Sequence, residues 1–246
     1  MKTNSIHWFK YAARQSFYFL AGKMWPWCAA LAALLMVVGL WISFFVAPVD
    51  AQQGQGYRII FVHVPSSQMS MFIYIVMAAW AGVGLAFNTR LSGMMAAALA
   101  PTGALFAFLS LLTGSLWGKP MWGTWWVWDA RLTSTLILLF FYLGFLALQS
   151  SIDDPRRADK ACAVLALVGV VNVPIIYFSV NWWNTLHQGA SVSLTRAPSM
   201  ATPMLWGMLI MVLAFWMYAI AAALARVRNI ILERERHTDW VKNAVE

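Results

Sequence analysis

Six long hydrophobic runs, none of which contains Asp, Glu, Lys, Arg or His, constrain the fold of this chain more than any other feature. They are residues 25–47, 69–87, 91–114, 132–149, 161–180 and 203–225. A helix needs about 20 apolar residues to cross the roughly 30 Å hydrocarbon core of a bilayer. The sequence therefore predicts an all-α integral membrane protein with six transmembrane helices.

Composition and charge agree with this prediction. Only 11% of the 246 residues are charged and 61% are hydrophobic, whereas soluble domains carry about a quarter charged residues. If both termini are cytoplasmic, 13 of the 17 Lys and Arg side chains fall in inner segments and 4 in outer loops. Because positive charge collects on the inner side, we expect this orientation. The net charge of +8 then follows from topology and requires no nucleic-acid partner.

The chain divides into three expected parts. Residues 1–24 form a cytoplasmic N-terminal segment, in which aromatic residues alternate with Lys10 and Arg14 as in an interfacial helix. Residues 25–225 form the six-span membrane domain, and residues 226–246 form a basic cytoplasmic tail. The first span is too long for the core of a signal peptide, so we interpret it as an uncleaved anchor. Cys28 and Cys162 are expected to be reduced packing residues.

The loop between the third and fourth spans is unusually rich in tryptophan. We call residues 115–134 the tryptophan segment. Its tryptophans are Trp117, Trp122, Trp125, Trp126 and Trp128. Because Gly118, Pro120 and Gly123 interrupt it, we predict that it does not form a regular helix. Five indole rings offer roughly 1,000 Å², more than the roughly 300–600 Å² of an ordinary apolar patch. This favours a ligand platform over an interfacial aromatic belt.

Two of the four histidines lie in the predicted outer loops. His63 precedes Val64–Pro65 and is expected on an extended stretch, with Ser66 or Ser67 capping the second span. His187 follows the fifth span within about two helical turns. Each could simply be a hydrogen-bonded interfacial side chain. Two neutral imidazoles beside a flat aromatic wall, however, suit the iron of a haem, whose ring supplies the other four ligands.

Charged residues in the outer loops are candidates for contacts with such a ligand. Arg58, Lys119 and Arg131 could bind the two haem propionates, because guanidinium and ammonium groups pair with carboxylates. Asp129 could orient Arg131 or the second nitrogen of a ligand histidine. Anchoring at the membrane surface is the alternative for all of these residues.

The segment "WGKPMWGTWWVWDARLTS" resembles the tryptophan-rich WWD signature of haem-handling membrane proteins in bacterial cytochrome c maturation. Together with "YRIIFVHVP" and "NWWNTLHQG", it is similar to the CcmC family, over about residues 25–228. The resemblance implies a protein of the bacterial inner membrane that holds haem b on the periplasmic face between His63 and His187. It also implies the partners CcmA, CcmB and CcmD, and delivery of haem to the chaperone CcmE. No catalytic residue is expected in this chain. Its only expected contribution to chemistry is to assist the covalent attachment of haem to the chaperone.

Other functions remain as alternatives. The chain could be the membrane subunit of an ABC-type exporter whose tryptophan loop only docks a protein. A membrane cytochrome b is disfavoured because none of the six runs contains a histidine. A secondary transporter is disfavoured because the runs lack ionisable residues, leaving Pro101, Asn172 and Pro174 as their irregularities. The stretch "GSLWGKP" is not an ATPase motif, since Pro120 stands where a magnesium-binding Ser or Thr is required.

Overall fold

The computed structural model describes residues 8–187, 189, 191, 192 and 197–245, and in these residues every named element is helical. The α-helices are α1 (Arg14–Trp41), α2 (Ile60–Phe87), α3 (Arg90–Trp122), α4 (Ala130–Ser151), α5 (Pro155–Gly169), α6 (Asn172–Trp182), α7 (Thr202–Arg234) and α8 (Asp239–Val245). Short 3-10 helices cover Trp8–Ala12 and Gln55–Ile59, and a π-helical turn, Ile42–Val46, extends α1.

Six helical stretches are long and apolar enough to cross a membrane, which confirms the prediction of six spans. Five of them are built on α1, α2, α3, α4 and α7, and the remaining one combines α5 and α6. Such lengths fit the roughly 30 Å of a bilayer core. The protein is therefore an all-helical, multi-pass membrane protein.

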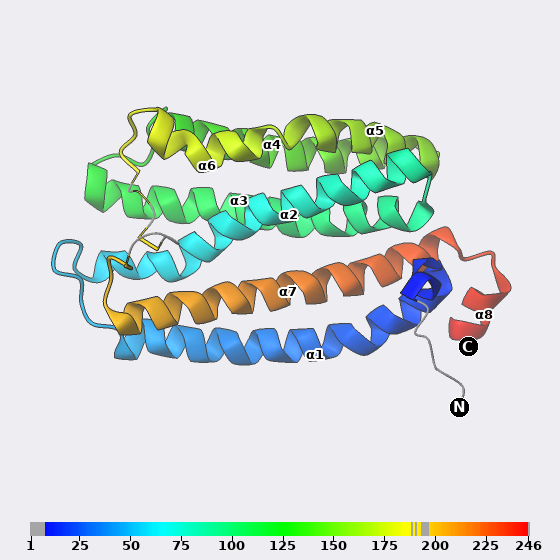
Figure 1. The fold of residues 1–246 in the computed structure, drawn as a ribbon, viewed down its shortest axis with the longest axis horizontal. Coiled ribbons are helices and arrows are strands. Elements are labelled where there is room, and N and C mark those ends of the chain that lie inside the picture. Colours follow the sequence, from blue (N-terminus) through cyan, green and yellow to red (C-terminus); the bar gives the residue numbers. More distant parts are fainter. Residues whose placement is uncertain (1–7, 188, 190, 193–196, 246) are drawn as a thin grey trace.

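The spans lie side by side in three layers, with α1 and α7 on one side, α2 and α3 in the middle, and α4, α5 and α6 on the other side (Figure 1). The beginning of α1, the end of α7 and α8 lie at one end of the bundle (Figure 1). The connections α1–α2, α3–α4 and α6–α7 lie at the opposite end, which we call the histidine end because it holds His63 and His187.

Most of the described N-terminal region is continuous with the first span. Helix α1 begins at Arg14 and runs unbroken to Trp41, so residues 14–24 are its first turns. Only the short 3-10 helix Trp8–Ala12 precedes it, and residues 1–7 lie outside the described residues. Pro26 lies inside α1 without ending it. At the C-terminus, α7 continues past residue 225 to Arg234, so the expected tail is largely helical.

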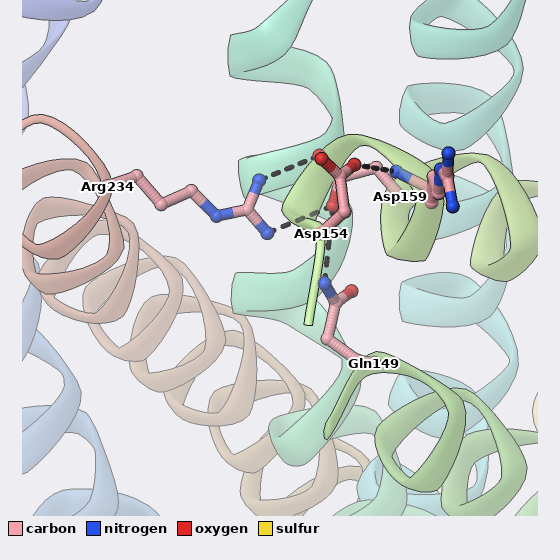
Figure 2. A network of polar contacts seen from close by, with 5 residues as sticks. Gln149, Asp154, Asp159 and Arg234 are labelled. Carbon is pink, nitrogen blue, oxygen red and sulfur yellow. Dashed lines mark hydrogen bonds and ion pairs between the residues drawn. The ribbon is translucent and has the colours of Figure 1, made fainter. Parts of the chain in front are cut away.

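A polar network joins three spans at the end of the bundle opposite the histidines (Figure 2). Arg234 of α7 forms a bidentate ion pair with Asp159 of α5, at 2.7 and 2.9 Å. Gln149 of α4 donates to the same carboxylate at 3.3 Å. Asp154 caps α5 by accepting a hydrogen bond from the Arg157 backbone N–H. The network therefore fixes α7 against α4 and α5, far from the histidines.

The fifth span is broken at Val170–Val171, between α5 and α6. Asn172, at the first turn of α6, donates a hydrogen bond of 2.8 Å from its side-chain amide to the Ser134 carbonyl of α4. The irregularity expected at Asn172 and Pro174 is thus confirmed. The irregularity at Pro101 is not observed as a break, because α3 runs continuously through it. Nearby, Tyr142 of α4 is fully buried and donates to the Ser70 carbonyl of α2.

Candidate functional site

His63 lies inside α2 rather than on an extended stretch, so that part of the sequence prediction was wrong. The 3-10 helix Gln55–Ile59 leads directly into α2, and Pro65 is tolerated in the second turn. Proline disfavours but does not forbid a helical residue before it. Ser66 does not cap the helix; its hydroxyl donates to the Val62 carbonyl at 2.7 Å. A spanning helix therefore carries a histidine. The absence of histidine from the six hydrophobic runs is thus no longer a reason against a membrane cytochrome b.

The tryptophan segment is also more helical than predicted. Helix α3 continues through Pro120 to Trp122 and ends at Gly123, whose φ of 78° is the left-handed conformation that glycine adopts at helix ends. Trp117 and Trp122 therefore lie on the last turns of α3, with ring centroids 5.0 Å apart in an edge-to-face pair. The remaining three tryptophans of the segment follow in the irregular connection to α4.

His187 lies in the connection between α6 and α7, and hydrogen bonds tie it to the tryptophan segment. Asp129 caps α4 by accepting from the Leu132 N–H at 2.7 Å. The other oxygen of Asp129 accepts a short hydrogen bond from the Thr185 hydroxyl. The same hydroxyl accepts from the His187 backbone N–H at 3.1 Å. Asp129 is thus linked to the backbone of His187 through the Thr185 hydroxyl.

His63 and His187 face one another across a cavity at the histidine end. Their ring centroids lie 6.0 Å apart, with an angle of 35° between the ring planes. The cavity has a volume of about 330 Å³ and includes Trp117, Trp122 and Arg131 in its wall. It extends down between the helices to Met71 and Met208. A mostly apolar cavity of this size with a few convergent polar groups is typical of a small-molecule site.

The three cationic candidates occupy different places. Arg131 lies in the cavity wall, where its Nη1 donates to the Ile176 carbonyl of α6 at 3.0 Å. Arg58 donates to the carbonyls of Ser43 and Ala47, which fastens the end of the first span to the 3-10 helix Gln55–Ile59 before α2. Lys119 donates to the Gly123 carbonyl at 3.2 Å on the exposed surface. Arg131 is therefore the cation best placed to meet a ligand.

Comparison with known proteins identifies the family. Residues 7–242 match the family model described as Heme exporter protein C. The chain is 46% identical over 229 residues to Heme exporter protein C of Escherichia coli strain K12, covering 93% of this chain and 92% of that protein. It is 47% identical over 232 residues to the Haemophilus influenzae protein of that name, covering 94% of each chain. The chain belongs to the Heme exporter protein C family.

A third Heme exporter protein C, from Bradyrhizobium diazoefficiens, is 50% identical over 215 residues, which are 87% of this chain and 81% of that protein. The region that matches the family model includes all six spans and both cavity histidines. Membership therefore concerns the membrane domain as a whole rather than the tryptophan segment alone.

In this member of the Heme exporter protein C family, the cavity brings together only part of the predicted tryptophan platform. Trp117 and Trp122 line it. Trp125 and Trp128 are 55% and 78% exposed and lie on the outer surface of the segment. Trp126 packs edge to face against Trp128, with ring centroids 5.4 Å apart. The platform is thus divided between a cavity wall and an exposed aromatic surface.

Three polar residues at the site were missed by the sequence analysis. Gln53 accepts a hydrogen bond from the Trp117 indole N–H at 3.0 Å and lines the cavity. Thr113 lies 3.0 Å from His63 Nδ1, and Thr185 contacts the backbone of His187. Thr185 precedes His187 by two residues, a spacing typical of hydroxyl turns that could have identified it. Gln53 and Thr113 carry no such sequence signal, because they meet their partners only in the folded chain.

Proposed function

We propose that this protein binds haem b at the periplasmic end of its membrane domain and delivers it to the haem chaperone CcmE during cytochrome c maturation. The observation that carries the proposal is the facing pair His63 and His187, brought from two different elements into one cavity. Relatives named for haem export support haem as the cargo.

The separation of the two rings suits one iron between them. Two imidazoles that share a metal ion through bonds of about 2 Å have ring centres about 6 Å apart, and the observed centroid separation is 6.0 Å. Among the described residues, no group of three His, Cys, Asp or Glu side chains is placed to hold a metal ion. A haem needs only two axial ligands from protein, since its ring supplies four. The donor set therefore fits haem better than a bare metal ion.

The cavity walls support specific roles for other residues. Trp117 and Trp122 offer apolar contact to the haem ring. Arg131 pairs with a propionate, because its guanidinium lies in the cavity wall and can bind a carboxylate. Lys119 and Arg58 are secondary propionate candidates, because their hydrogen bonds hold them to backbone carbonyls.

The exposed tryptophans support a surface for haem transfer. Trp125 and Trp128 project at the histidine end, and Trp126 packs against Trp128. Exposed aromatic surface of this kind marks interaction sites. We propose that CcmE docks there, so that its own histidine reaches the haem edge and forms the covalent bond. The ABC transporter subunits CcmA and CcmB and the small protein CcmD complete the assembly, in the bacterial inner membrane with both termini cytoplasmic.

Transfer of haem to CcmE tests this proposal. Detergent-purified protein loaded with hemin is mixed with purified CcmE, and covalent haem on CcmE is measured by gel staining. The wild type should load and transfer haem, whereas the double variant His63→Ala/His187→Ala should do neither. Wild-type haem content in the double variant would contradict the proposed ligands. The matched control is His237→Ala, whose exposed side chain lies at the opposite end of the bundle.

The same experiment separates haem binding from a protein-docking role. If the wild-type protein takes up no haem under any loading condition but still binds CcmE, the aromatic surface is a docking surface on an exporter subunit. If Trp128→Ala loads haem normally but transfers it slowly, docking and haem binding are separate properties of the segment. The latter result is expected, since Trp128 is highly exposed and lies outside the cavity wall.

A further inference from the structure

We propose that two threonine hydroxyls, those of Thr113 and Thr185, position the two cavity histidines. This inference rests on the proposed haem-binding function and adds two residues to it. Thr113 lies on α3 and contacts the imidazole of His63. Thr185 lies in the α6–α7 connection and contacts the backbone of His187. In both cases the hydroxyl is also bonded to a fixed acceptor, which determines how it can meet the histidine.

The hydrogen bonds around Thr113 determine the tautomer of His63. A hydroxyl has one proton to donate, and that of Thr113 is directed to the Leu109 carbonyl at 2.6 Å. The Thr113 oxygen must therefore accept from His63 Nδ1, which lies 3.0 Å away. His63 then carries its proton on Nδ1, and Nε2 keeps the lone pair that a metal requires. Thr113 thus prepares His63 as an Nε2 ligand before haem arrives.

The backbone of α3 also restricts the His63 ring. A side chain at Gly114 would place its Cβ 3.2 Å from His63 Cε1, which is tighter than ordinary van der Waals contact. The next residue along α3 from Thr113 is thus a glycine that the imidazole approaches closely. The hydrogen bond and this close approach together hold the ring in one orientation.

Thr185 positions the second histidine by the same logic. The Asp129 carboxylate can only accept, so the Thr185 hydroxyl donates its proton to Asp129. Its lone pair is then available to the His187 backbone N–H, at 3.1 Å. The loop that carries His187 is thereby fastened to the N-terminal cap of α4, which Asp129 also forms. Thr185 acts on the position of His187, whereas Thr113 acts on the ring of His63.

These roles predict different consequences for the iron. Donation from the far nitrogen of a ligand imidazole increases its basicity, and loss of such partners typically costs about 10–100-fold in metal affinity. Thr113→Val removes the hydroxyl acceptor while keeping the side-chain shape, and leaves the His63 imidazole the backbone carbonyl of Ser110 as a partner. It should weaken haem binding by about tenfold or more and raise the reduction potential, since a less basic imidazole stabilises ferric iron less. Thr185→Val should weaken binding through faster haem dissociation, with little change in potential.

The test compares Thr113→Val, Thr113→Ser, Thr185→Val and Thr185→Ser in the purified full-length protein. Hemin affinity, dissociation rate and reduction potential are measured for each. The Ser variants retain the hydroxyl and should restore wild-type values. Thr89→Val is the matched control, because Thr89 is the N-cap residue at the opposite end of α3 and its hydroxyl contacts only Ser92 among the described residues. If a Val variant does not fold, the tautomer of His63 is measured instead by 15N NMR on the haem-free wild-type protein with labelled histidine.

The outcomes separate this inference from the function on which it rests. If both Val variants keep wild-type affinity and potential while His63→Ala loses haem, the positioning role is wrong and the haem site stands. A proton on Nε2 of His63 in the haem-free protein would also overturn the role of Thr113. If His63→Ala and His187→Ala both keep wild-type haem, the proposed function itself fails.

Discussion

Arg131 and Ile176 are joined by a hydrogen bond of 3.0 Å from the guanidinium to the backbone carbonyl. This bond connects the first turn of α4 to the middle of α6, in the wall of the cavity that holds both histidines. A guanidinium carries five N–H donors, so one bond to a carbonyl leaves capacity for a carboxylate. Arg131 is therefore both a link between two spans and the cation presented to a ligand.

Arg131→Gln is expected to lower hemin affinity by about tenfold or more, since a hydrogen bond to a charged group contributes roughly 1.5–3 kcal/mol. The matched ligand is haem dimethyl ester, which lacks the propionate charges. Its affinity should be the same for the wild type and the variant. Equal losses for both ligands, measured by absorbance titration, would show that Arg131 acts through structure alone. Arg90→Gln, at the opposite end of the bundle, is the control variant.

Trp117→Ala should weaken hemin binding on the order of tenfold, because a well-placed aromatic contact contributes about 1 kcal/mol beyond the area it buries. Trp117→Phe should lose less, since it keeps a ring but not the hydrogen bond to Gln53. The control is Trp27→Ala, because Trp27 is 79% exposed on α1 and lies outside the cavity wall. Equal affinity losses in Trp117→Ala and Trp27→Ala would contradict the assignment of Trp117 to the haem wall.

Arg234→Ala should lower the free energy of unfolding by about 2 kcal/mol without changing the spectrum of bound haem. Removing one partner of a buried ion pair costs about 3–5 kcal/mol, and the expected cost is smaller here because the side chains remain 17% and 18% exposed. Asp159→Asn combined with Arg234→Ala should recover part of the loss. Denaturant unfolding in detergent measures both. Lys242→Ala, which breaks the exposed pair with Asp239, should leave stability unchanged.

Gly103→Ala should destabilise the protein strongly, because a Cβ at this position would overlap the ring of the buried Tyr142. Overpacking of a core typically costs about 1–3 kcal/mol. Gly144→Ala is the matched control, since its Cβ would meet Leu165 at an ordinary 3.5 Å. The melting temperature in detergent should fall for the first variant and hold or rise for the second. Equal melting temperatures for the two variants would contradict tight packing of Gly103 against Tyr142.

The hydrophobic runs were sufficient to predict the six spans, because the length of an apolar helix follows directly from the thickness of a bilayer. The helix ends were harder to predict. Pro65 and Pro120 were taken as helix breakers, yet both lie inside helices. Proline costs one backbone hydrogen bond, and packing of the surrounding helix can offset that cost. Local sequence rules therefore gave the wrong structure at both places.

The sequence was sufficient to single out candidate residues for the site, but not to predict which partners their side chains contact. His63 and His187 were candidates from the sequence because they lay in the predicted outer loops beside the tryptophan segment, and the structure brings their rings together. Arg58 was as good a candidate as Arg131 by position in an outer loop. Only the folded chain shows that Arg58 is bonded to the end of the first span, whereas Arg131 lies in the cavity wall.

Ligation of one haem iron by His63 and His187 is tested by the visible and EPR spectra of the purified, hemin-loaded protein, recorded beside His63→Ala and His187→Ala. We expect a low-spin, six-coordinate ferric haem in the wild type and in His237→Ala. Each of the two cavity variants should lose haem or convert it to a high-spin, five-coordinate form. A low-spin spectrum that persists unchanged in either cavity variant would contradict ligation of one iron by this pair.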